Sequence, residues 1–174
     1  ATREGNTFVT VGPLVEMLVE GQVPGKRIEL GKGGGTLNVS WKIESLRMPI
    51  ENVEVVVGGE TAAEVSGNRE LEAEGSAAVK LDRSSWVALR VRGSNHGKPE
   101  EIAAHTSAVQ VVVDGEAIFS KTDAMEVLRQ IEGSLAYIDT IATRGEAGQY
   151  KRLRLKLETA WNTMHQRMHR QGVY

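Results

Sequence analysis

Apolar and polar residues alternate along most of the first 119 residues, which is the pattern of half-buried β-strands. The clearest case is the run of Leu37, Val39, Trp41 and Ile43, in which each apolar residue is followed by a polar one. Successive side chains of a strand point to opposite faces, so this segment predicts a strand with one buried face. The same pattern predicts strands at 7–11, 15–19, 27–30, 52–57, 61–65, 70–81 with Gly75 as a candidate break, 86–91, 109–113 and 117–119.

Short glycine-containing turns separate these predicted strands. Gly58-Gly59 and Asp114-Gly115 lie between apolar runs and predict two-residue hairpin loops, because glycine tolerates the positive φ angles that such loops need. The run GKGGG at 31–35 precedes a strand rather than a helix, so it predicts a turn and not a phosphate-binding loop. Many short strands without an intervening helix favour an antiparallel, immunoglobulin-like β-sandwich over residues 1–121.

The apolar period changes to three and four after Phe119, which predicts two helices within residues 122–174. Thr122 or Asp123 is expected to cap the first helix, with Glu126 as the capping-box partner of Asp123. Gly145 and Gly148 are expected to end it. The first stripe comprises Ala124, Val127, Leu128, Ile131, Leu135, Ile138 and Ala142, and the second comprises Tyr150, Leu153, Leu157, Ala160, Trp161, Met164 and Met168.

These stripes predict a C-terminal α-helical hairpin that packs on or beside the sandwich. Residues 123–148 carry two basic and five acidic side chains, whereas residues 149–174 carry six basic and one acidic, so the helices attract each other. Exposed ion pairs contribute only about 0–1 kcal/mol each, so apolar contact must supply most of the stability. The second stripe is equally suited to a second copy of the chain, so a homodimer through the C-terminal helices is an alternative.

Composition narrows the classes of partner and cofactor. The chain has no cysteine, which excludes disulfides and thiolate metal sites. A net charge of −2 gives no field that would attract nucleic acid or a membrane surface, and no run of about 20 apolar residues is present. The opening residues ATREG have neither an initiator Met nor a signal-peptide pattern, so a processed product or a fragment is expected. The compartment stays undetermined.

Polar residues within and after the predicted loop at 93–101 are the best candidates for binding a ligand. They are Asn95 and His96 in that loop, and His105, Thr106 and Ser107, which precede an apolar strand. A structural role is favoured for the second group, because hydroxyl and imidazole groups satisfy backbone groups in turns. No acidic residue stands within a few residues of this trio, which leaves the distant Asp82 and Asp114 as the candidates for the third member of a catalytic triad. A triad is disfavoured, and no catalytic residue is predicted.

His165 and His169 stand four residues apart, a spacing that places two imidazoles on one helix face. Gln166 occupies the position where a metalloprotease helix has Glu, and no further ligand stands nearby in the sequence. A solvated helix end is therefore favoured over a metal site.

Several segments resemble one protein family in the same order along the chain. The segment GNTFVTVGP at 5–13 resembles an element of the CehA/McbA-type, carbaryl-hydrolase-like metallohydrolases of the PHP superfamily. Segments 49–60 (PIENVEVVVGGE), 85–91 (SWVALRV) and 104–109 (AHTSAV), with Asp123-Ala124, resemble the C-terminal β-domain of the same proteins. Val11 and Ala108 depart from the usual asparagine and proline of that family.

The resemblance implies that this chain is a non-catalytic accessory domain of a metal-dependent hydrolase. Such proteins place a metal-binding PHP barrel before this β-domain, and none of the barrel's metal ligands falls within the present sequence. The resemblance therefore implies a PHP-type catalytic domain in the same parent polypeptide as the partner, with the divalent metal in that domain and no cofactor in this chain.

Two alternatives belong to other functional classes. One is a free-standing sandwich whose loops around Asn95-His96 and His105 bind a carbohydrate, a peptide or a surface polymer, with tryptophans contributing if they are exposed. The other is a small hydrolase that uses His105, Thr106 and Ser107.

Overall fold

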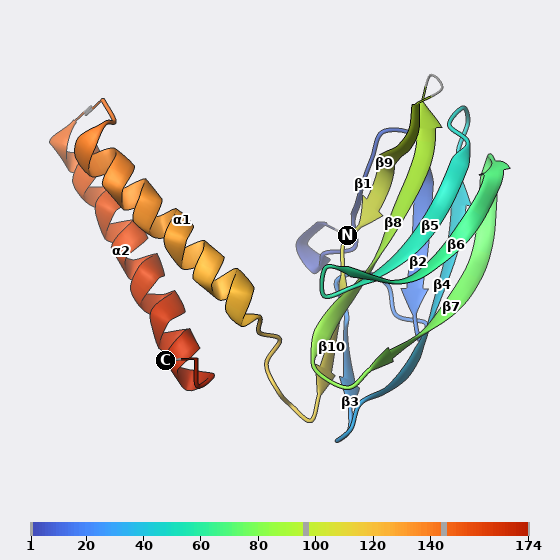
Figure 1. The fold of residues 1–174 in the computed structure, drawn as a ribbon, viewed down its shortest axis with the longest axis horizontal. Coiled ribbons are helices and arrows are strands. Elements are labelled where there is room, and N and C mark those ends of the chain that lie inside the picture. The colour runs from blue at the N-terminus through green and yellow to red at the C-terminus, as the bar shows by residue number, and fades with distance from the viewer. Residues whose placement is uncertain (1, 96–97, 144–145, 174) are drawn as a thin grey trace. The chain divides into compact units, whose positions relative to one another are not determined.

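The computed structural model describes residues 2–95, 98–143 and 146–173. The chain divides into two compact units, Ala1–Ile118 and Phe119–Tyr174 (Figure 1). The described strands all belong to the first unit and both α-helices to the second. The chain is thus mainly β, with antiparallel-rich sheets and two C-terminal helices.

The first unit begins with a short 3-10 helix, η1 (Thr2–Glu4). Its strands are β1 (Phe8–Thr10), β2 (Leu14–Val19), β3 (Arg27–Leu30), β4 (Gly35–Glu44), β5 (Ile50–Val57), β6 (Glu60–Glu70), β7 (Glu72–Leu81), β8 (Ser85–Asn95), β9 (Lys98–Thr106) and β10 (Val109–Val113).

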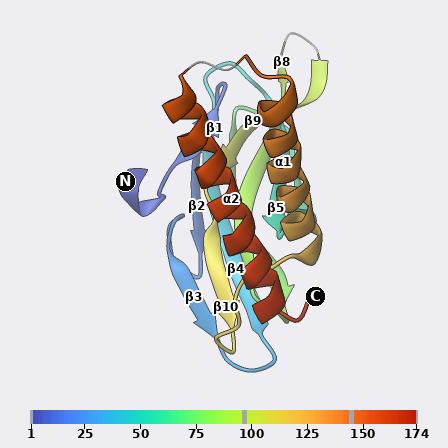
Figure 2. The same cartoon turned by 90° about the vertical axis from the view of Figure 1, so that its left-hand side faces the viewer.

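These strands form two sheets. The seven-stranded sheet has the order β1-β9-β8-β10-β3, with β5 also paired to β8 and β6 to β5, and the three-stranded sheet has the order β2-β4-β7. Figure 2 shows β3 beside β10. Within the described residues every strand pair is antiparallel except β3 with β10. The predicted antiparallel arrangement is confirmed for the other described pairs and is wrong for this one, since β3 and β10 lie far apart in sequence and no tight hairpin fixes their relative direction.

The core confirms the alternation seen in the sequence. Leu37, Val39, Trp41 and Ile43 on β4 are all buried, and β2 alternates exposed and buried residues along its whole length. One cluster of buried side chains takes members from both sheets, including Val39 and Ile43 of the smaller and Leu89 of the larger.

Two glycine predictions have different outcomes. Gly58 and Gly59 have positive φ angles and connect β5 to β6 as a two-residue hairpin, as predicted. The predicted break at Gly75 is wrong, because β7 continues through it. A Cβ on Gly75 would lie 3.0 Å from the ring of Trp41 on the neighbouring strand, so the glycine makes room for that ring.

The largest error of the sequence interpretation concerns β9. Much of this strand was predicted to be a loop, because PEEI at 99–102 shows no alternation and Ala103 and Ala104 have little apolar surface. The predicted strand at 117–119 is not formed. Asp114 and Gly115 do make a turn with positive φ angles, but the chain then leaves the sheet and Ser84 Oγ donates to the carbonyl oxygen of Glu116.

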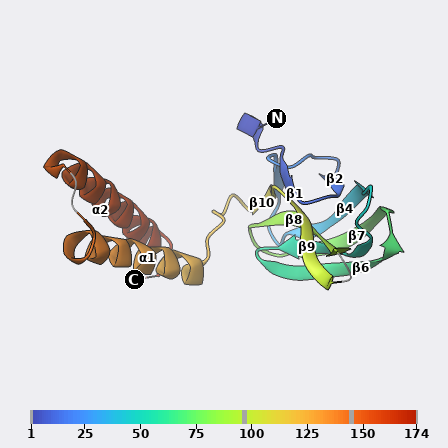
Figure 3. The same ribbon diagram turned by 90° about the horizontal axis from the view of Figure 1, so that it is seen from above.

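The second unit consists of α1 (Lys121–Thr140) and α2 (Ala147–Arg170), which lie side by side (Figure 3). Ser120 caps α1 by accepting a hydrogen bond from the Asp123 amide, so the predicted caps at Thr122 and Asp123 were displaced by two to three residues. Trp161 donates to Glu132, and Tyr150 donates to Asp139. Later residues of α2 thus contact earlier residues of α1, which makes the helices antiparallel.

Candidate functional site

The residues predicted to bind a ligand fall into two places. His96 lies outside the described residues, and Asn95 is described only as the last residue of β8. His105 and Thr106 end β9, and Ser107 follows directly. The positions around residues 105–107 are therefore the ones whose geometry can be assessed.

His105 is half-buried on β9, paired with Val9 of β1 on one side and with Arg90 of β8 on the other. Its Nδ1 lies 2.7 Å from the carbonyl oxygen of Thr106. A carbonyl oxygen only accepts, so this nitrogen donates and the imidazole is held against its own strand.

Thr106 occupies a break in the sheet between β9 and β10, which share one edge of β8. Arg90 of β8 pairs with β9 and Val87 pairs with β10, so Leu89 lies between the two ladders. The buried Thr106 hydroxyl accepts a hydrogen bond of 2.9 Å from the Leu89 amide. At this break neither β9 nor β10 pairs with Leu89, and the Thr106 hydroxyl serves as the acceptor for its amide. The contact is stabilising, because a buried amide without an acceptor costs free energy.

Ser107 extends the same junction toward β1. Its hydroxyl lies 2.7 Å from the Thr7 hydroxyl, and its amide donates to the Thr7 carbonyl oxygen. Like Thr106, it makes contacts that join strand ends.

The trio does not converge on one point. Adjacent residues of a strand point to opposite faces, so the His105 and Thr106 side chains diverge. The imidazole of His105 contacts a carbonyl oxygen and the Thr106 hydroxyl contacts the Leu89 amide. The described contacts contain no hydroxyl-to-imidazole pair at this position of the kind that nucleophilic catalysis needs.

Replacing Thr106 with Val is expected to lower the free energy of unfolding by about 2 kcal/mol, because the Leu89 amide loses its acceptor in a buried position. Urea denaturation measures this loss, and amide hydrogen exchange of Leu89 should accelerate. Thr106→Ser keeps the hydroxyl and serves as the matched control, with unchanged exchange at Leu89. Wild-type exchange at Leu89 in Thr106→Val would contradict the assigned role.

A groove of about 810 Å³ lies beside β2 and was not anticipated from the sequence. Asn6, Phe8, Leu18, Trp41, Lys42 and Thr106 are among the residues that line it. They come from segments far apart in the chain, so no local motif marks the groove. Its mixed lining suits a small ligand with polar and apolar parts.

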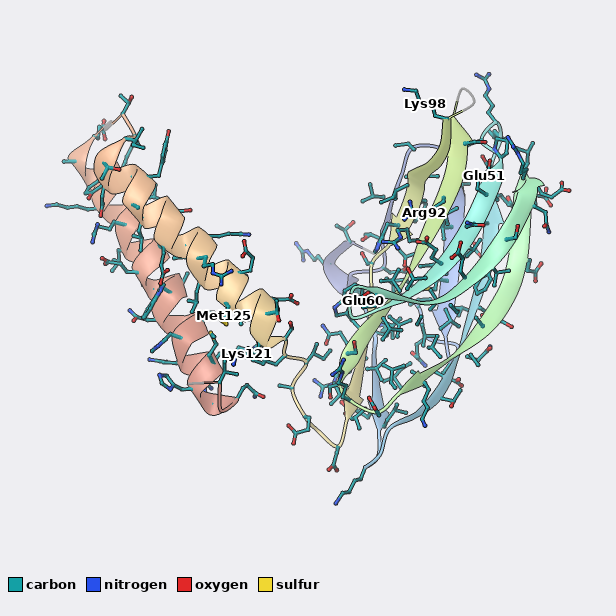
Figure 4. The ribbon with its side chains drawn as sticks, in the orientation of Figure 1. Glu51, Glu60, Arg92, Lys98, Lys121 and Met125 are labelled. Atoms are coloured by element: carbon teal, nitrogen blue, oxygen red, sulfur yellow. The ribbon has the colours of Figure 1, made fainter. Side chains whose placement is uncertain are left out.

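A buried carboxylate on β5 is the second feature that the sequence did not indicate. Glu54 is buried and accepts hydrogen bonds from Nε of Arg90 and, at 2.7 Å, from Nε of Arg92, both on β8. Arg92 is labelled in Figure 4. Arg90 also donates to Thr61 of β6 at 3.0 Å. The alternation of Arg90 and Arg92 along β8 could have indicated a buried acidic partner. The sequence alone does not show that β5, which carries Glu54, lies beside β8.

The electrostatics of this cluster follow from two opposing effects. Burial by itself raises the pKa of the Glu54 carboxyl, but the hydrogen bonds and charges of Arg92 and Arg90 outweigh it and lower the pKa below its ordinary value. The carboxylate is therefore ionised and paired, which is the behaviour of a structural ion pair rather than of a general acid.

The histidines of α2 make ring contacts with each other and with Trp161. His165 lies parallel to the Trp161 ring with 4.6 Å between centroids, and His169 meets His165 edge-on at 4.5 Å. No group of three or more potential metal-ligating side chains occurs among the described residues. The expectation that this chain holds no metal stays a prediction.

Comparison with known proteins leaves the family open. No protein-family model and no curated protein matches this chain. Over the residues that the structure covers, neither helix combines the length and the apolar character that crossing a bilayer requires.

Proposed function

We propose that the first unit is an immunoglobulin-like β-sandwich that serves as a non-catalytic accessory domain of a PHP-type metal-dependent hydrolase. The observation that carries this proposal is the location of the segments that resemble that family. Segments 5–13, 49–60, 85–91 and 104–109 are distant in sequence but fall on neighbouring strands of the seven-stranded sheet.

The pairing joins these segments residue by residue. Phe8 and Thr10 of the first segment pair with Thr106 and Ala104 of the last. Val91 pairs with Ala104 on one side and with Val53 on the other, which links the remaining two segments. A resemblance that came from amino-acid composition alone would not be expected to fall on neighbouring strands. The pairing of the four segments therefore supports the proposal that they form the same structural unit as in the PHP-type hydrolases.

The sandwich part of the proposal rests on the core. Buried residues of the three-stranded and seven-stranded sheets belong to one cluster, which is what two stacked sheets produce. The alternation along β2 and β4 gives the smaller sheet one buried face, as a sandwich requires.

The non-catalytic, accessory role is supported by the contacts of the polar side chains, which bond to neighbouring strands. The hydroxyls of Thr106 and Ser107 and the carboxylate of Glu54 bond to neighbouring strands of the same unit. Val9, Val11 and Ile102 are exposed apolar side chains at the β1 edge of the larger sheet, and a packed catalytic domain would cover such a surface.

Hydrolysis assays test the non-catalytic assignment. The purified chain is incubated with a p-nitrophenyl ester and with a bis-p-nitrophenyl phosphodiester, with and without added Mn²⁺ or Zn²⁺. The rates are expected to equal those of buffer containing the same metal. Turnover that is lost in His105→Ala would contradict the proposal and favour the small-hydrolase alternative.

The proposal that a PHP-type catalytic domain belongs to the same polypeptide is tested separately by the gene sequence. The reading frame upstream of the codon for Ala1 is expected to encode a barrel rich in His and Asp. An unrelated upstream domain would overturn the PHP assignment without affecting the non-catalytic one.

A free-standing ligand-binding module is the second candidate, and the groove beside β2 is the observation that favours it. Trp41 lines the groove but is buried, so it offers little ring surface for stacking on a sugar. This alternative becomes the better explanation if a sugar or peptide shifts NMR signals selectively at groove residues such as Asn6, Phe8 and Leu18.

A further inference from the structure

The described contacts of charged side chains that join the two helices of the second unit lie on one side of the pair. Asp139 of α1 accepts hydrogen bonds from Tyr150 and Arg154 of α2, and Arg154 also pairs with Glu158 at 3.1 Å. On the same side, Trp161 donates to Glu132 at 2.9 Å. Polar groups on this side are thus satisfied within one copy of the chain.

The side of the helix pair that carries Leu153 has uncharged residues at its centre, with Glu126 at its border, where this carboxylate accepts a hydrogen bond from Gln130. A shallow groove of about 640 Å³ runs along it. Its lining residues are Gln130, Gly133, Ser134, Tyr137, Ile138, Leu153 and Leu157, none of which carries a formal charge.

The contact between α1 and α2 covers only part of the apolar stripe on each helix. Full burial is reached only by Ala124, Leu128 and Met168 among the described residues of α1 and α2. Tyr137 remains 55% exposed and Leu153 remains 47% exposed, and both belong to the uncharged groove. Two helices cannot cover stripes of this width, whereas four can.

We propose that the uncharged groove is a dimer interface in which a second copy supplies two more helices and completes a four-helix bundle. The occupant follows from charge. Helix α1 carries four acidic and two basic side chains, and α2 carries one acidic and six basic. By helical spacing, Glu126 of α1 and Lys156 of α2 border the groove, away from the contacts that join the helices within one copy. A second copy places its basic α2 beside the acidic α1 and its acidic α1 beside the basic α2 at the same time.

Charge also selects the orientation of the two copies. A two-fold axis parallel to the helices places α1 of one copy against α2 of the other, with antiparallel neighbours throughout. A two-fold axis perpendicular to the helices, lying in the interface, would instead place the basic α2 helices against each other. The first arrangement is therefore the one proposed.

Substitutions in the groove test the interface on the 174-residue chain. Light scattering coupled to gel filtration is expected to show twice the 18.9 kDa chain mass for the wild type. Leu153→Glu and Tyr137→Glu each place a charge in the groove and are expected to raise the dimer dissociation constant at least about 30-fold.

Leu155→Glu is the matched control, because Leu155 is 64% exposed on the same helix but lies about 200° around it from Leu153. It is expected to remain dimeric. Wild-type protein of 18.9 kDa up to high concentration, or equal effects of Leu153→Glu and Leu155→Glu with unchanged circular dichroism, would overturn the proposal. A monomer would indicate that another part of the chain covers the groove.

Cross-linking tests the orientation, since the cysteine-free chain makes every introduced thiol unique. Ser134→Cys lies in the groove on α1, and Ala160→Cys lies on the same side of α2, three residues after Leu157. Oxidation of a mixture of the two single variants is expected to yield mainly the mixed disulfide. Predominant linkage of each variant to itself would overturn the proposed orientation.

Discussion

Replacing Gly34 with Ala is expected to lower the free energy of unfolding by about 3–4 kcal/mol. Gly34 lies in the turn between β3 and β4 with a φ of +73°, and a Cβ there would lie 1.8 Å from the carbonyl oxygen of Leu81. The left-handed conformation costs an L-residue roughly 1–2 kcal/mol, and overpacking adds about 1–3 kcal/mol. Backbone atoms form the obstacle, so no change of rotamer relieves it.

Gly33→Ala provides a neighbouring control in the same turn. Gly33 has a φ of +92°, but no atom lies within 4 Å of the added Cβ. Its cost is expected to be only the conformational one, about 1–2 kcal/mol. Urea denaturation followed by tryptophan fluorescence measures both variants, and equal losses would show that contact with Leu81 does not set the cost at Gly34.

Replacing Glu54 with Gln is expected to destabilise the first unit by about 3 kcal/mol at neutral pH. The variant keeps the shape of the side chain but leaves Arg90 and Arg92 without the carboxylate that lies between them. Removing one partner of a buried ion pair costs about 3–5 kcal/mol. The lower end applies here, because both arginine side chains keep some contact with solvent.

The same cluster makes part of the stability depend on pH. The pKa of Glu54 is lower in the folded chain than its ordinary value of 4.5, so its contribution is fully present above pH 4.5. The contribution is lost as the pH falls through the lowered pKa. The difference in unfolding free energy between wild type and Glu54→Gln is therefore expected to shrink below pH 4.5.

Glu64→Gln is the control for this effect. Glu64 lies on β6, pairs with Glu54 across the strands and is exposed. Its replacement is expected to change stability by no more than about 0.5 kcal/mol. Urea titrations of the three proteins between acidic and neutral pH provide the comparison, and a pH-independent difference for Glu54→Gln would contradict the ionised-pair assignment.

The elements that were predicted correctly are those with strong local patterns. Strand β4 was evident from its alternation, and the turn at Gly58-Gly59 from the conformational freedom of glycine. Both helices were evident from their apolar stripes. Their boundaries were less accurate, because Ser120 lay outside the apolar stripe that was used to place the first cap.

The missed elements depend on distant partners. Strand β9 has a weak pattern of its own and is held by β1 and β8 on its two sides. The role of the Thr106 hydroxyl follows from its position opposite Leu89 at a break between two ladders, which no local motif describes. The ion pairs of Glu54 likewise require knowing that β5 lies beside β8.

The sequence by itself determined the class of the chain, a strand-rich part followed by two amphipathic helices, because the periods of apolar residues are set by local backbone geometry. Only the tertiary structure decided which strands are neighbours, where the parallel pair β3–β10 occurs and which side of the helix pair is left apolar. These features arise from contacts between residues far apart in the chain. The free energy of such contacts depends on the packing of the whole unit and not on the residues adjacent in sequence.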